Sequence, residues 1–178
     1  MKRPLMLAVF GCAALMARAT HESAPPRVAL ALEQTRFKSA LVNEMEKLLE
    51  RDGVEVTVVN HADGELDTID PAAFNAVFIT NSGVNSRVRP QVVSWIEAQE
   101  PYTSRILLHT TQTRDWTVET TVDAVTSASA TREVATLARE YVEKLRAILA
   151  STATGGGEGE GDTDEDEDAD APADPDEE

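Results

Sequence analysis

Short apolar runs and helical patterns alternate between residues 27 and 150 of this chain. The runs are continuous or rich in β-branched residues, as expected for strands that are buried on both faces of a sheet. We expect five strands, over residues 28–32, 54–59, 76–80, 105–109 and 122–126. Apolar positions at helical spacing predict three amphipathic helices, over residues 37–49, 90–99 and 134–149. The polar segment over residues 60–74 is expected to hold a single helical turn at most.

Strands that alternate with helices form a parallel sheet covered on both faces, because each right-handed crossover places its helix against the sheet. The predicted fold is therefore α/β, a three-layer, doubly wound, five-stranded parallel sheet. The order and spacing of the elements over nearly all of residues 27–150 resemble the flavodoxin-like fold family. That resemblance implies the strand order 2-1-3-4-5 and a ligand site beyond the carboxyl ends of the strands.

The segment before this domain has the pattern of an export signal. Two basic residues precede an apolar run over residues 5–16, and a small-x-small cleavage site follows, which predicts a secretory signal peptide over residues 1–19. Residues 9–12 also resemble a bacterial lipoprotein box, in which Cys12 would carry a lipid and be the only membrane attachment. Both interpretations predict an exported protein, periplasmic or extracellular, in which residues 20–26 form a linker.

The net charge of −16 belongs largely to the C-terminal segment. Residues 151–178 hold 13 acidic and no basic residues, which predicts a disordered acidic tail that either solubilises the protein or binds a partner. Residues 27–150 hold 18 acidic and 13 basic residues, and no continuous basic patch predicts nucleic-acid binding. Because Cys12 is the only cysteine, the mature domain has no disulfide and no thiolate metal site.

Three loops are expected at the carboxyl ends of the strands, over residues 33–39, 81–89 and 110–120. In flavodoxins the first loop is rich in Ser, Thr and Gly and cradles the FMN phosphate, whereas here it contains no glycine. The resemblance implies cofactor contacts in these loops from Thr35, Arg36, Lys38, Ser39, Asn81, Ser82, Gly83, Thr110 and Trp116. Among these residues, Trp116 is the one expected to stack on a ring.

Basic residues are frequent in and beside the same three loops. They are Arg36, Lys38, Arg87, Arg89 and Arg114. If these side chains face one mouth, they predict an anionic ligand. The alternative is that they are solvated and paired with Glu33 or Asp115.

Residues 123–129, Asp-Ala-Val-Thr-Ser-Ala-Ser, resemble the flavinylation motif of the FMN-binding domains of exported redox proteins. In that family the final Ser or Thr receives FMN through a phosphoester bond. The resemblance implies attachment at Ser129, with Asp123 and Thr126 as part of the signal that a flavin transferase reads, while Ser127 stands where glycine is common. Alternatively, Ser129 is an ordinary N-cap of the last helix.

These residues lead to three hypotheses about function. The first is an exported electron-transfer protein that carries FMN, covalent at Ser129 or dissociable, and meets a redox partner or a flavin transferase. The second is a flavin-free flavodoxin-like module that binds a small anionic ligand or a protein partner. The third is a hydrolase built from Ser82, His109 and Asp115, although the chain lacks a G-x-S-x-G nucleophile elbow. No residues at ligand spacing predict a metal site.

Overall fold

Five parallel strands form one sheet in the computed structural model, which describes residues 24–61, 65–113 and 116–154. The strands are β1 (Arg27–Leu32), β2 (Glu55–Asn60), β3 (Ala76–Ser82), β4 (Ile106–Thr111) and β5 (Asp123–Ser127). Their order is β2-β1-β3-β4-β5, and all four neighbouring pairs are parallel. The predicted fold class and strand order are confirmed.

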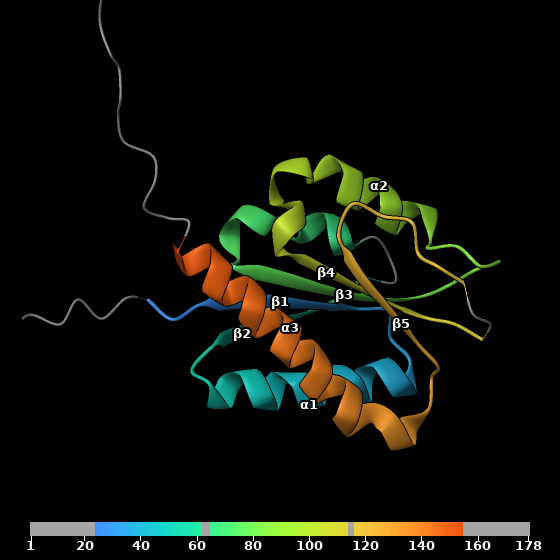
Figure 1. The fold of residues 1–178 in the computed structure, drawn as a ribbon, viewed down its shortest axis with the longest axis horizontal. Helices are drawn as coiled ribbons and strands as arrows, with labels where there is room; N and C mark the ends of the chain where they lie inside the picture. Colours follow the sequence, from blue (N-terminus) through green and yellow to red (C-terminus); the bar gives the residue numbers. More distant parts are fainter. Residues whose placement is uncertain (1–23, 62–64, 114–115, 155–178) are drawn as a thin grey trace, which may run out of the picture.

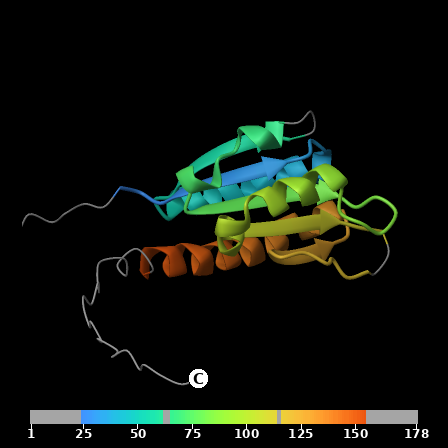
Figure 2. The same cartoon turned by 90° about the horizontal axis from the view of Figure 1, so that it is seen from above.

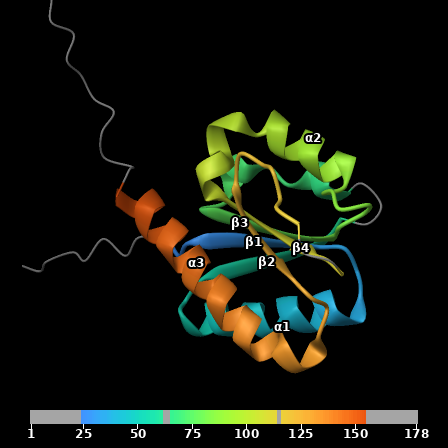
Figure 3. The same ribbon diagram turned by 45° about the vertical axis from the view of Figure 1, so that its right-hand side comes forward.

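Helices cover both faces of the sheet, which gives three layers (Figures 1 and 3). One face carries α1 (Arg36–Arg51) and α3 (Val134–Thr154), and the other carries α2 (Pro90–Ala98). Short 3-10 helices complete the chain, at η1 (Glu65–Thr68), η2 (Pro71–Ala73), η3 (Glu100–Arg105) and η4 (Thr131–Glu133). The expected single turn between β2 and β3 is thus two 3-10 helices, because Leu66 and Ile69 are buried under that face of the sheet.

Local sequence explains where α1 begins and ends. Thr35 is the N-cap, and its Oγ1 accepts a hydrogen bond from the backbone N–H of Lys38 at 3.3 Å. Gly53 follows the helix with φ of 77°, and the N–H of Val54 donates to the carbonyl oxygen of Leu49 at 3.1 Å. This left-handed turn is favourable for glycine and ends the helix, as the sequence predicts.

The core has two parts, one on each face of the sheet. Side chains alternate along each strand, so that Leu30 and Phe78 face α1 and α3, while Ala29 and Ile79 face α2. Strand β1 is buried at every position except Arg27, as expected for the middle of a parallel sheet. Within the described residues, no helix is long and apolar enough to cross a membrane.

Several boundaries differ from those expected, and three of them concern the carboxyl edge of the sheet and the end of the domain. Strand β3 continues through Asn81 and Ser82, and β4 continues through Thr110 and Thr111, where loops were predicted. These polar residues stay in the sheet because the Asn81 Nδ2 donates to the carbonyl oxygen of His109 and to the Thr110 Oγ1, at 3.2 and 3.1 Å. Helix α3 runs four residues past the expected end of the domain, to Thr154. The predicted signal segment and the predicted tail beyond that residue lie outside the described residues.

Candidate functional site

The loops that follow β3 and β4 leave the sheet at the same end, the carboxyl edge of the strands (Figure 2). The loop between β1 and α1 is joined to this edge by the N–H of Glu33, which donates to the carbonyl oxygen of Thr80 at 3.1 Å. Parallel strands place their following loops together in this way, and ligands of doubly wound sheets bind at this edge. Two groups of side chains occupy it.

The first group, the Glu33 cluster, consists of Glu33, Lys38, Ser82 and Arg89. The Lys38 Nζ lies 2.8 Å from the Glu33 Oε2 and donates to the Ser82 Oγ at 2.6 Å. The backbone N–H of Ser82 donates to the same Glu33 oxygen at 2.8 Å, and Arg89 lies 2.5 Å from the other one. One carboxylate thus joins the starts of α1 and α2 to the end of β3.

Charge is held deeply in this cluster. The side chain of Lys38 is only 1% exposed and that of Glu33 is 17% exposed. Burial alone would raise the pKa of Glu33, but hydrogen bonds from Lys38 and Ser82 and the charges of Lys38 and Arg89 outweigh it and lower the pKa to about 2. Burial lowers the pKa of Lys38, and the contact with Glu33 opposes that change. Glu33 is therefore ionised in the folded protein at neutral pH.

An acidic side chain lies at the mouth where a flavodoxin-like site would hold a phosphate. Glu33 already takes the Ser82 N–H and the Lys38 Nζ, and Thr35 takes the Lys38 N–H, whereas the buried Arg89 Nε has no hydrogen-bond partner among the described residues. An incoming phosphate would meet the Glu33 carboxylate, which repels it, and would compete with that carboxylate for Lys38 and Arg89. Ser39, the other expected hydroxyl, lines a separate hollow with Asn60.

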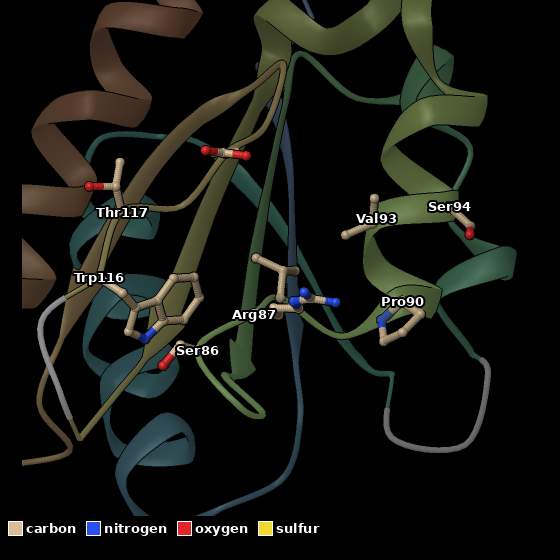
Figure 4. Close-up of a pocket in the computed structure, with 9 residues that line it drawn as sticks. Ser86, Arg87, Pro90, Val93, Ser94, Trp116 and Thr117 are labelled. Atoms are coloured by element: carbon tan, nitrogen blue, oxygen red, sulfur yellow. The ribbon is translucent and has the colours of Figure 1, made fainter.

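The second group, the Trp116 pocket, lies between the start of α2 and residues 116–119. It has a volume of about 570 Å³, and its lining includes Arg87, Pro90, Val93, Trp116 and Glu119. Figure 4 shows Trp116 on one side, Pro90 and Val93 on the other, and Arg87 between them. The volume is within the range of small-molecule sites, which run from about 300 to 1,000 Å³.

Gly83 and Trp116 fix each other's position. A Cβ at residue 83 would lie 2.8 Å from the Trp116 Cζ2 and 3.3 Å from the Thr110 Cγ2. Only glycine therefore lets the indole lie against the end of β3. The predicted ring-contacting residue is thus a wall of a pocket on the α2 face, and Gly83 is the reason that it can lie there.

His109 faces the opposite layer and does not reach this edge. It is fully buried, with its Nδ1 2.8 Å from the Thr80 Oγ1 and its Nε2 2.8 Å from the Ser127 Oγ. Burial, followed by the charge of Lys38, lowers its pKa to about 3. Because Ser82 is bonded to Lys38 rather than to His109, the predicted Ser82–His109–Asp115 hydrolase triad is not assembled. Asp115 lies outside the described residues.

The residues of the flavinylation motif are spread along β5 and the segment that follows it. Asp123 begins the strand, at the end away from Ser129, and forms an ion pair with Lys144 at 3.1 Å. Thr126 and Ser129 are exposed. Ser129 is not a helix cap, because η4 begins at Thr131 with Ala130 as its N-cap.

The expected mouth of five cations is not assembled. Lys38 and Arg89 are both paired with Glu33, Arg36 and Arg87 are exposed without an ion pair in the part of the chain that the structure describes, and Arg114 lies outside that part. Over residues 24–61, 65–113 and 116–154, no three His, Cys, Asp or Glu side chains gather as a metal site. Sequence reasoning did not identify Glu119, which lies in an irregular connection, or the contact of the Ser127 hydroxyl with the buried His109.

Comparison with known proteins gives the fold and nothing finer. No protein-family model matches the chain, and no curated protein matches its sequence. Among solved structures, a flavodoxin from the domain Archaea superposes with a TM-score of 0.50 at 10% identity, covering 68% of this chain and 98% of the flavodoxin. The flavodiiron protein from Giardia intestinalis gives a TM-score of 0.54 at 10% identity, covering 72% of this chain but only 37% of its own length. The chain therefore has a flavodoxin-like fold.

Proposed function

We propose that this domain is a flavin-free flavodoxin-like module that binds a small ligand in the Trp116 pocket. The observation that carries the proposal is the Glu33 carboxylate, which binds the Lys38 Nζ and the Ser82 N–H at the mouth where a dissociable FMN would place its phosphate. The pocket is a concave feature of the carboxyl edge, and it has an aromatic wall, several hydroxyls and a guanidinium, that of Arg87, with no ion pair among the described residues. Those are the components of small-molecule sites.

The test is a flavin assay on protein made in an exporting host that has its own flavin transferase. We expect the purified protein to show no visible flavin bands, and added FMN to keep its full fluorescence in the presence of the protein. A flavin that binds and is released by acid precipitation would contradict the proposal. A Glu33→Ala variant, assayed in parallel, serves as the comparison because it removes the carboxylate from the mouth.

Covalent flavin at Ser129 is the second candidate, and one observation favours it. The Ser129 hydroxyl is exposed and is not used to cap a helix. A phosphoester bond at this residue would not require the mouth that Glu33 fills. In this case the flavin stays with the acid-precipitated protein, and Ser129→Ala abolishes it while Ser151→Ala does not. Such a result would make the protein an electron carrier with a redox partner and a flavin transferase as its partners.

We also propose that the protein is exported, on the pattern of residues 1–19. Cell fractionation tests export directly, and the Cys12→Ser variant distinguishes lipid attachment at Cys12 from ordinary signal cleavage. If the mature protein leaves the membrane fraction only in this variant, Cys12 carries a lipid. If wild type and variant are both free in the periplasm or medium, ordinary signal cleavage operates. Retention of the uncleaved chain in the cytoplasm would contradict export.

A further inference from the structure

We propose that the ligand of the Trp116 pocket is a small aromatic zwitterion, such as a free aromatic amino acid. The inference rests on the proposed function and adds the chemical class of the ligand. It combines three features of the pocket: two opposite charges that do not pair with each other, an arginine whose backbone closes a turn, and an aromatic wall.

The charges are the most selective feature. Arg87 and Glu119 both line the pocket and are both exposed, and neither forms an ion pair within the described ranges. A ligand with a carboxylate and an ammonium group complements both charges. A dianion such as a phosphate ester would be attracted by Arg87 but repelled by Glu119, so that little net attraction would remain.

The backbone of Arg87 is held in place by a closed turn. In this two-residue turn, the N–H of Val84 donates to the Arg87 carbonyl oxygen at 2.9 Å and the reverse bond is 3.1 Å long. Asn85 and Ser86, at the centre of the turn, have φ of 52° and 56°. Such left-handed residues are uncommon outside glycine, and strained backbone of this kind clusters at binding sites. The guanidinium that this turn carries into the lining of the pocket suits the planar, two-oxygen geometry of a carboxylate.

The aromatic part of the ligand follows from the walls. Trp116 lies against Gly83 on one side, and Pro90 and Val93 form an apolar surface on the other (Figure 4). A flat ring can lie between them with its polar end toward Arg87. Stacking on an aromatic side chain adds to the gain from area burial, so the ring should contribute measurably to binding.

The experiment is isothermal titration of the purified protein with four related compounds. L-Phenylalanine has an ammonium group, a carboxylate and an aromatic ring. Each of the others lacks one of these groups: 3-phenylpropionate lacks the ammonium group, phenethylamine lacks the carboxylate, and L-alanine lacks the ring. We expect phenylalanine to bind about tenfold more tightly than each of the others, a difference of about 1.4 kcal/mol. Arg87→Gln should remove the advantage over phenethylamine, Glu119→Gln the advantage over 3-phenylpropionate, and Trp116→Leu the advantage over alanine. Arg36→Gln, an exposed cation outside the pocket, is the matched control and should change nothing.

Equal binding of phenylalanine and 3-phenylpropionate, or no binding of phenylalanine at all, would overturn the zwitterion assignment. Either result leaves the flavin assay unaffected, since the protein can be colourless and still take another ligand. A dissociable flavin would overturn the proposed function itself, whatever the four compounds do. The two failures are therefore distinguishable.

Discussion

Replacing Glu33 by Gln should destabilise the fold because it leaves the buried Lys38 without its negative partner. The substitution preserves shape and leaves an amide oxygen that can accept hydrogen bonds, but it removes the negative charge beside Lys38. The Lys38 Nζ, on a side chain only 1% exposed, is then left beside Arg89 without a counter-ion. Removal of one partner from a buried pair usually costs about 3–5 kcal/mol, because the remaining charge stays away from water.

The pKa of Glu33 gives a second estimate of the stability that this ion pair contributes. Its fall from 4.5 to about 2 corresponds to about 3 kcal/mol of stability at neutral pH, of which burying the charge of Lys38 takes back a part. We therefore expect Glu33→Gln to lower the free energy of unfolding by about 3 kcal/mol. Lys38→Met should cost less, since Glu33 would keep its contact with Arg89. The double variant should have a free energy of unfolding close to that of Lys38→Met alone. Its loss of stability should be much smaller than the sum of the two single losses.

Urea denaturation at pH 7, followed by circular dichroism, measures these differences. The matched control is Glu44→Gln, which removes one member of an exposed pair with Lys47 at 3.6 Å and should change the free energy of unfolding by less than about 0.5 kcal/mol. If Glu33→Gln changes the stability no more than Glu44→Gln does, the cluster is not a buried charge pair. The same holds if the double variant shows the full sum of the single losses.

Acid should reproduce part of this loss in the unchanged protein. The folded pKa of Glu33 lies below the unfolded value, so its contribution is present above about pH 4.5 and is lost as the pH falls toward about 2. Urea midpoints across this range should fall more steeply for wild type than for Glu33→Gln. Equal slopes in the two proteins would contradict the lowered pKa.

Three further predictions concern the rest of the carboxyl edge and its neighbour in the core. Gly83→Ala should cost about 1–3 kcal/mol and shift the tryptophan emission to longer wavelength, because the new methyl group displaces the Trp116 ring; an unchanged spectrum would show that the ring has room. Ser86→Gly should raise the free energy of unfolding by about 1 kcal/mol in urea denaturation, since glycine accepts the φ of 56° without strain, and a loss of stability would contradict the turn. Because of His109, the free energy of unfolding should be about 2 kcal/mol lower at pH 5 than at pH 7. The pKa of His109 is about 3 in the folded protein, so between that value and pH 6.5 only the unfolded chain binds the proton. The difference should largely disappear in His109→Gln.

The sheet could be predicted from the sequence because its strands are buried on both faces. Runs such as residues 28–32 and 76–80 have no polar interruption, and the helical spacing around Leu41 and Met45 is regular. The strand ends were harder to predict. Asn81 reads as a loop residue, yet it is buried in β3 because the side chain of Thr110 and the backbone of His109 accept its hydrogen bonds.

The site was less predictable, because tertiary pairing decides the role of each charge. Lys38 was expected to meet a ligand, but it is buried against Glu33 and Ser82. A signal for this was present, since Lys38 lies three residues before Leu41 and so continues the apolar stripe of α1. Glu119 gives no comparable signal, because it belongs to a connection with no regular period.

The Glu33 cluster also constrains how this sequence can evolve. A single substitution that removes the carboxylate leaves a buried ammonium group, so a lineage that gains or loses an anion site at this mouth would pass through an unstable intermediate. Residues 33 and 38 are therefore expected to change together among relatives. If they change one at a time, Lys38 should change first, because Arg89 still pairs with the Glu33 carboxylate after Lys38 is lost. Reconstructed ancestral sequences would show whether Lys38 and Glu33 changed in that order.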